Sequence, residues 1–159
     1  MKTLIVFASK TGTTEKCARK LAAYLDDAKV VDLMKESPNI AGYDRIVVGG
    51  SIRMGTLHKK AKDFIDSHAA QLKTQKFALF ICHGFIDQAA DFIEKNISAD
   101  LREKAIAIDT FGGELEIERQ KGMDKLIIKM VGKSAAGKSA PKPRILEENI
   151  KAFAEKLQQ

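Results

Sequence analysis

The sequence predicts a single α/β domain in which helices cover both faces of a doubly wound parallel sheet. Two observations predict this fold: short apolar runs alternate with helical patterns, and loops rich in glycine and hydroxyl groups follow the runs. Alternating strands and helices of this length give parallel strands joined by right-handed crossovers. A chain of 159 residues is long enough to give one such domain a substantial core.

Five apolar runs are expected to be strands. The first contains the continuous apolar run from Leu4 to Phe7. The third is rich in β-branched residues, as buried parallel strands are. The second is short and stops before a breaker segment at 36–39, which contains the sequence Ser-Pro-Asn. The expected strands cover residues 2–8, 29–33, 45–49, 76–82 and 105–109.

Helices are expected between these strands and at the end of the chain. In the second helix, for example, Ala61, Phe64 and Ile65 fall on one face. Ser98 stands where an N-cap is expected, before a short helical turn. The expected helices cover residues 13–25, 59–70, 87–96, 99–104 and 145–157.

Composition places the chain among globular proteins, with 45% hydrophobic and 30% charged residues. No apolar stretch approaches the roughly 20 residues that span a bilayer, and the apolar run near the N-terminus is too short for a secretory leader. We therefore expect a cytoplasmic protein. Cys17 and Cys82 are too few for a disulfide scaffold, and neither has metal-ligand spacing to another Cys or His, so no metal site is expected.

The loop between the first strand and the first helix predicts a phosphate-binding site. This phosphate loop comprises Ser9, Lys10, Thr11, Gly12, Thr13 and Thr14. A helix N-terminus offers unpaired N–H groups and a partial positive charge to an anion, and the hydroxyls add further donors. The spacing fits neither G-x-x-x-x-G-K-[ST] nor G-x-G-x-x-G. An ordinary helix N-cap at Thr13 or Thr14, without a ligand, is the alternative.

Two further loops follow strands that should end at the same edge of the sheet. The first ring segment comprises Ser51, Ile52, Arg53, Met54 and Gly55, and the second comprises Cys82, His83, Gly84 and Phe85. Three glycines, at 49, 50 and 55, would permit close approach of the backbone to a flat ring. Because ligands of such sheets bind at the carboxyl ends of the strands, the three loops together predict a nucleotide-cofactor pocket. Ordinary turns of an α/β domain are the alternative.

Residues 6–14 resemble the phosphate loop of flavodoxins, and the whole chain fits the flavodoxin-like strand order 2-1-3-4-5. Residues 44–55, with their Ser-Ile-Arg-x-Gly core, are similar to the same segment of flavodoxin-type, menaquinone-dependent protoporphyrinogen oxidases of bacteria. The segments 110–115 and 123–130 also resemble that group. The resemblance implies one flavodoxin-like domain over residues 1–159.

By this resemblance the cofactor is flavin mononucleotide (FMN), with its phosphate in the phosphate loop and its isoalloxazine ring between the two ring segments. The implied activity is two-electron oxidation of a substrate such as protoporphyrinogen IX with a quinone as acceptor. A flavodoxin-type electron carrier and a fold that has lost its flavin are the alternatives. The sequence identifies no general acid or base. With no Trp and no Tyr in either ring segment, His83 and Phe85 are the rings available there for stacking.

The formal charge of +6 is concentrated after the fifth expected strand. Between Arg119 and Arg144 there are eight basic residues and one acid, so this part carries +7 and the remainder about −1. We expect residues 119–142, the basic segment, to be an insertion into the domain. It contains an apolar helical stripe at Met123, Leu126, Ile127, Met130 and Val131.

Such a basic amphipathic helix can lie at the inner face of the cell membrane, where quinone resides, or against a partner protein. It can also simply pack on the domain. Aromatic residues do not interleave the lysines and no recognition motif is present, so nucleic acid is not an expected partner. A net positive charge also disfavours the carrier, because the flavodoxins that the chain resembles are mostly acidic and dock on basic partners.

Overall fold

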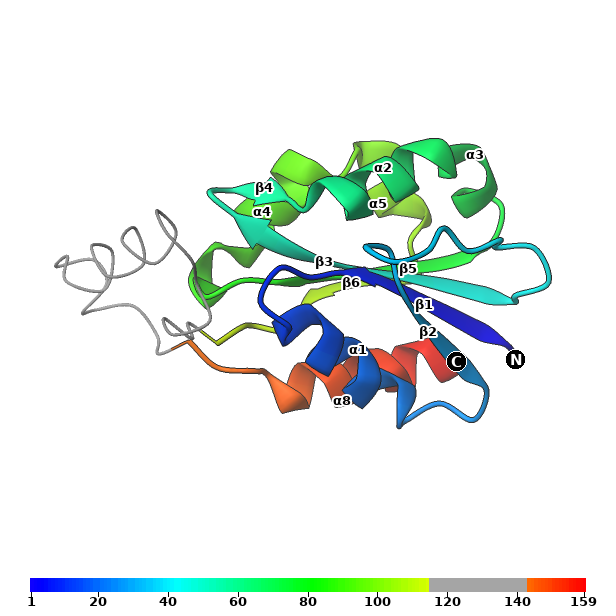
Figure 1. The fold of residues 1–159 in the computed structure, drawn as a ribbon, viewed down its shortest axis with the longest axis horizontal. Helices are drawn as coiled ribbons and strands as arrows, with labels where there is room; N and C mark the ends of the chain where they lie inside the picture. Colours follow the sequence, from blue (N-terminus) through cyan, green and yellow to red (C-terminus); the bar gives the residue numbers. More distant parts are fainter. Residues whose placement is uncertain (115–142) are drawn as a thin grey trace, which may run out of the picture.

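The computed structural model describes residues 1–114 and 143–159. One sheet forms the middle layer, with α1 and α8 on one face and α2, α3, α4 and α5 on the other (Figure 1). Its strands run in the order β2-β1-β3-β5-β6, all parallel, and β4 pairs antiparallel with β3. This confirms the predicted doubly wound sheet. The predicted order 2-1-3-4-5 did not count the short β4. Its fourth and fifth strands correspond to β5 and β6, so the predicted and observed orders are the same.

The strands are β1 (Thr3–Ala8), β2 (Ala28–Asp32), β3 (Arg45–Arg53), β4 (Thr56–Leu57), β5 (Lys76–Cys82) and β6 (Ala107–Thr110). The helices of the described residues are α1 (Thr13–Ala22), α2 (Lys59–Ser67), α3 (Ala69–Leu72), the 3-10 turn η1 (Ile86–Gln88), α4 (Ala89–Asn96), α5 (Ala99–Lys104) and α8 (Glu147–Gln158). Each expected strand and helix is present, with ends that differ by a few residues.

Two hydrophobic cores lie on the two faces of the sheet, because neighbouring residues of a strand point to opposite faces. In β1, Leu4 and Val6 pack toward the helices α2 to α5, whereas Ile5 and Phe7 pack toward α1 and α8. On the latter face the rings of Phe80 and Phe111 stack at a centroid distance of 4.3 Å. The central strands β1, β3 and β5 are therefore buried on both sides, which explains why their runs are continuously apolar.

Three local expectations need correction. The third strand does not end at residue 49 but runs to Arg53, because β4 folds back on it and pairs Ile52 with Leu57. The helix expected over 59–70 is interrupted at His68, whose ring nitrogen Nδ1 lies 2.9 Å from the carbonyl oxygen of Phe64. Ser98 stands at the N-cap of α5, yet its side chain makes no capping hydrogen bond in the described structure.

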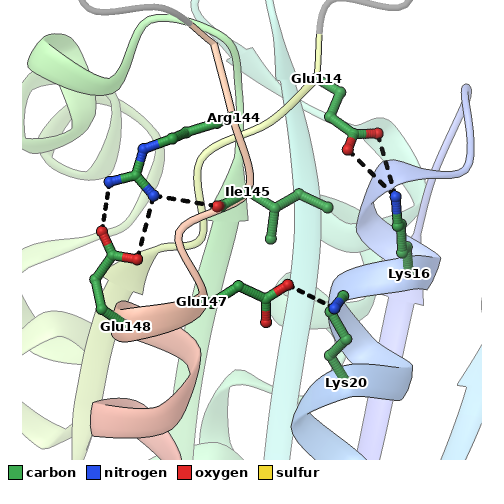
Figure 2. Close-up of polar contacts among 7 residues, drawn as sticks. All are labelled: Lys16, Lys20, Glu114, Arg144, Ile145, Glu147 and Glu148. Carbon is green, nitrogen blue, oxygen red and sulfur yellow. Dashed lines mark hydrogen bonds and ion pairs between the residues drawn. The ribbon is translucent and has the colours of Figure 1, made fainter.

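The basic segment 119–142 and its expected helical stripe lie outside the described residues. The chain on either side of residues 115–142 is fixed near the start of α1 (Figure 2). The Gly113 N–H donates to the Arg144 carbonyl at 3.0 Å, and Lys16 pairs with Glu114 at 3.2 Å. A second pair, Lys20 with Glu147 at 2.5 Å, joins α1 to α8. Such exposed pairs each contribute little, so the backbone contact is the firmer attachment.

None of the helices among the described residues is both long and apolar enough to cross a bilayer.

A substitution at Gly49 tests how closely strand β3 packs against the ring of Phe80. It is the cross-strand partner of Phe80, and a β-carbon at Gly49 would lie 2.1 Å from the end of the Phe80 ring. Gly49→Ala is therefore expected to lower the free energy of unfolding by about 1–3 kcal/mol, as overpacking of filled cores does. Urea denaturation followed by circular dichroism measures this loss.

The double variant Gly49→Ala/Phe80→Leu provides the control. Its loss should be smaller than the sum of the two single losses, because leucine leaves room for the added methyl group. A Gly49→Ala variant as stable as the wild type would contradict the described packing.

Candidate functional site

Strand register brings the three predicted loops to one edge of the sheet. Ala8 pairs with Gly50, Gly50 with Ile81, and Ile81 with Thr110, so the four strands reach the carboxyl edge at the same level. The phosphate loop and both ring segments start from this row. Strand β1 has β2 on one side and β3 on the other, and such a reversal of strand order is where parallel sheets open a ligand crevice.

The phosphate loop turns directly into helix α1. Gly12 is the N-cap with a φ of 94°, a left-handed conformation that favours glycine. The Ser9 hydroxyl accepts a hydrogen bond from the Gly12 N–H at 2.9 Å and thereby tightens the loop. Thr13 and Thr14 are the first two residues of the helix and are buried. The alternative that one of them is the N-cap is therefore wrong.

Two buried hydroxyls lie at this edge of the sheet. Thr14 Oγ1 and Ser51 Oγ are inaccessible to solvent and have no hydrogen-bond partner among the described residues. A buried hydroxyl without a partner costs about 1–3 kcal/mol, so a bound group that accepts from both would remove that cost. The Thr14 hydroxyl lies close enough to Cys82 to lower the pKa of its thiol, but their geometry does not amount to a hydrogen bond.

The first ring segment forms the end of β3 and a tight hairpin turn. Met54 and Gly55 both have positive φ, 50° and 74°, and they join the paired residues Arg53 and Thr56. Two such residues form a type I′ turn, where Asn-Gly is usual. A left-handed conformation costs a residue such as Met about 1–2 kcal/mol, and its side chain is 82% exposed. Both features are unfavourable, and packing of a flat apolar group against the Met54 side chain would offset the cost of its exposure.

The three glycines of this region do not share one purpose. Gly49 lies against the Phe80 ring, and a β-carbon at Gly50 would lie 2.5 Å from Leu57. Both are needed for packing within the domain. Gly55 alone of the three stands at the turn. Packing within the domain therefore accounts for Gly49 and Gly50 without reference to a ligand.

The second ring segment is tied to the end of β6. The His83 ring is 6% exposed, its Nε2 lies 3.1 Å from Thr110 Oγ1, and it meets the Phe92 ring edge-on at 4.9 Å. Burial lowers the pKa of His83 to about 4, although the Phe85 backbone and Asp87 act to raise it. His83 is therefore neutral at pH 7, and its Nδ1 has no geometrically sound partner among the described residues.

Cys82, beside Ser51 in the register, is completely buried. Burial, and then the neighbouring Cys17 thiol, raise the pKa of Cys82 well above its ordinary value. The thiol stays protonated and is not a nucleophile at neutral pH. The other two members of this segment, Gly84 and Phe85, are half-buried.

Positive charge gathers beside the phosphate loop. His58 caps α2, its Nδ1 accepting from the Lys60 N–H at 3.2 Å, as expected for a cap. Burial lowers the pKa of His58, and the nearby charges of Arg53 and Lys10 lower it further, while Asp32 acts in the opposite sense. Lys10 comes from the phosphate loop and Arg53 from the end of β3, and their positive charges at this edge suit an anionic ligand.

Sequence reasoning missed the residues that support the site. Thr110 accepts the Gly112 N–H at 3.1 Å and contacts His83, and Asn96 binds the hairpin from α4. Thr110 is 27 positions from His83 in the sequence, and Asn96 is 41 positions from Gly55. An ordinary Thr at the end of a strand and an Asn at the end of a helix give no sequence signal of such contacts.

A parallel sheet of this order, with its loops gathered at the carboxyl edge of β1 and β3, is the architecture of flavodoxin-like proteins. Comparison with known families agrees. Residues 4–142 match the model of the flavodoxin domain, and the chain belongs to this family.

Similar proteins include an enzyme and small flavoproteins. The chain is 27% identical to protoporphyrinogen IX dehydrogenase (quinone) of Escherichia coli strain K12, over 99% of this chain and 94% of that protein. Among solved structures, a flavodoxin from the domain Archaea has a TM-score of 0.53 at 18% identity, covering 87% of this chain and 98% of that one. A flavoprotein from Lactobacillus acidophilus NCFM, solved in complex with FMN, has a TM-score of 0.50 at 17% identity and covers 69% and 92%.

His83 makes the stability of the domain depend on pH. Its pKa is about 4 in the fold and 6.5 when exposed, so the unfolded state binds more protons between these values. The contribution of neutral His83 is complete above pH 6.5 and is lost as the pH falls toward 4. The loss amounts to roughly 3 kcal/mol at most.

Urea denaturation of the wild type and of His83→Gln, from pH 7 to pH 4.5, measures this dependence. The variant should lose stability less steeply as the pH falls, and the wild-type ring should titrate near pH 4 by NMR. A ring that titrates near 6.5 would contradict the buried, neutral state.

Proposed function

We propose that the protein binds FMN at the carboxyl edge of its sheet and acts as an oxidoreductase. The observation that carries this proposal is the pair of buried hydroxyls Thr14, at the start of α1, and Ser51, near the end of β3, which have no hydrogen-bond partner among the described residues. We expect the phosphate beside the first and the edge of the flavin ring beside the second. The flavodoxin-domain family and the FMN complex of a protein with this fold support the choice of cofactor.

The phosphate loop would hold the FMN phosphate. The first-turn N–H groups of α1 have no intrahelical partners, as at any helix start, and the hydroxyls of Ser9, Thr11, Thr13 and Thr14 surround them. Lys10 adds positive charge to the same loop. Gly12 keeps this approach open because its left-handed backbone carries no side chain.

The two ring segments would hold the isoalloxazine ring. Met54 at the hairpin tip supplies an apolar, polarizable surface, and Phe85 supplies the ring of the second segment. Ser51, Arg53 and the backbone of Gly55 and Gly84 would meet the polar edge. Bound flavin supplies the two-electron chemistry, and the protein binds, orients and shields it.

We further propose that the substrate is protoporphyrinogen IX or a similar compound and that the acceptor is a quinone. The E. coli relative that aligns over nearly the full length of both chains carries that activity in its name. The positive charges of Lys10 and Arg53 near His58 would attract carboxylate groups of a substrate toward the flavin.

For the basic segment 119–142 we propose contact with an anionic membrane surface, where quinone is available to a protein otherwise in the cytoplasm. The charge of the sequence supports this, since seven basic residues and one acid lie within it. The described residues that flank 115–142 lie beside α1 and α8, since Glu114 pairs with Lys16 of α1 and Arg144 with Glu148 of α8 (Figure 2).

An electron carrier that docks on redox proteins is the second candidate function. The small flavodoxins that share the fold favour it. The net charge of +6 opposes it, because a basic surface repels the basic partners on which acidic carriers dock. An anaerobic titration separates the two: reduction in one two-electron step favours the enzyme, and two separate one-electron steps favour the carrier.

Thr14→Val tests the phosphate site. Hydrogen bonds to charged groups contribute about 1.5–3 kcal/mol, so FMN binding should weaken by roughly 10- to 150-fold. The free energy of unfolding of the apoprotein should not fall, because the hydroxyl has no partner there. Quenching of FMN fluorescence measures the first and urea denaturation the second.

Thr74→Val is the matched control, since Thr74 bonds the Gln71 carbonyl at 2.9 Å on the exposed end of α3. Equal FMN affinity of Thr14→Val and Thr74→Val would argue against a phosphate at α1.

Turnover of protoporphyrinogen IX with a menaquinone analogue tests the activity. The FMN-loaded wild type should oxidise the substrate.

Binding to vesicles of anionic lipid tests the basic segment. A triple variant in which Lys125, Lys129 and Lys133 are changed to Gln should bind the vesicles more weakly, because about 1 kcal/mol per basic residue is lost. The control changes three exposed lysines near the other edge of the sheet, Lys73, Lys76 and Lys104, to Gln.

Absence of turnover in the FMN-loaded protein would rule out the porphyrin substrate. Equal vesicle binding by both triple variants would rule out membrane contact through the basic segment.

A further inference from the structure

We propose that Asn96, at the end of α4, is a positioning residue that fixes the hairpin Arg53–Thr56 over the flavin. The inference rests on the proposed binding of FMN. Neither the family match nor the similar proteins assign a role to this side chain, and α4 contains none of the site residues predicted from sequence.

The side-chain amide of Asn96 bonds the turn and the second strand of the hairpin. Its Oδ1 accepts the Leu57 N–H at 2.8 Å, and its Nδ2 donates to the Gly55 carbonyl at 2.9 Å and to the Phe92 carbonyl at 2.8 Å. The oxygen faces a donor and the nitrogen faces two acceptors, so the amide has one satisfactory orientation. Asn96 thereby fixes the direction of the Gly55 carbonyl and the place where β4 begins.

The hairpin needs such support because it is short and strained. Strand β4 has two residues and pairs only with the last two residues of β3, outside the row of parallel strands. A two-stranded hairpin is marginally stable by itself, and Met54 at its tip is held in a left-handed conformation. Without the bonds from α4, the turn would relax and the exposed Met54 side chain would lose its fixed position.

The same helix also braces the second ring segment. Phe92, four residues before Asn96 and hence on the same face of α4, packs edge-on against the buried His83 ring. Asn96 therefore holds the first ring segment and Phe92 the second. Helix α4 sets the spacing between the two segments that would enclose the isoalloxazine ring.

Two variants of Asn96 separate the bond that its oxygen accepts from the two that its nitrogen donates. Asn96→Ala removes all three. Asn96→Asp keeps an acceptor for the Leu57 N–H but places a carboxylate oxygen against the Gly55 carbonyl. Asn39→Ala is the matched control: Asn39 Oδ1 accepts the Ala41 N–H at 2.9 Å in an exposed loop before β3. Amide hydrogen exchange of the apoprotein, FMN affinity and the midpoint potential of bound FMN are measured for all four proteins.

Leu57 should lose exchange protection in Asn96→Ala and keep it in Asn96→Asp. Both variants should bind FMN at least about fivefold more weakly, the effect of one net hydrogen bond, and should shift its midpoint potential. Asn39→Ala should change neither quantity.

A wild type that does not bind FMN would refute the proposed function, independently of the exchange result. A wild type that binds FMN, with Asn96 variants of equal affinity and potential, would overturn the role of Asn96 alone. Changes of the same size in Asn39→Ala would also overturn it, because they would reflect general loss of stability.

Discussion

The parallel register of four strands is the constraint on which the rest of the structure depends. Ala8, Gly50, Ile81 and Thr110 stand at the same level across the sheet, so the loops that follow them meet at one edge. A shift of one residue in any of these pairs would turn its side chains to the opposite face of the sheet. The two cores prevent such a shift, because every described strand from β1 to β5 carries apolar side chains that are buried against helices.

At this edge the molecule retains features that reduce its own stability. Buried hydroxyls at Thr14 and Ser51 lack partners among the described residues, Met54 is exposed in a left-handed conformation, and His83 is held neutral by burial. His83 Nδ1 also lacks a partner there, and one further buried atom without a partner among the described residues, Gln75 Oε1, lies before the start of β5 at the opposite edge. Local strain and unpaired polar groups persist where the surrounding structure imposes them, and they concentrate at binding sites. Their common location favours a ligand over ordinary turns.

The sequence could predict much of this because its signals are local. Continuous apolar runs mark strands that are buried on both faces, and a glycine among hydroxyls marks the start of α1. The errors arose where distant contacts decide the structure. Residues 51–53 belong to β3 because residues 56–57 fold back on them, and Gly49 is small because the Phe80 ring lies over it. Neither fact follows from the residues nearest in sequence.

The sequence by itself therefore determined the α/β class, the strands and helices, and the three loops in which a cofactor is expected, since periodicity and loop composition act within a few residues. The strand order followed from the resemblance to flavodoxins. The tertiary structure decided how those loops are held. It assigned the capping position to Gly12, made His83 a buried neutral ring against Thr110, and joined both ring segments to α4 through Asn96 and Phe92. The physical reason is that these contacts are hydrogen bonds and ring packing between residues far apart in the chain, which exist only after the sheet has fixed their positions.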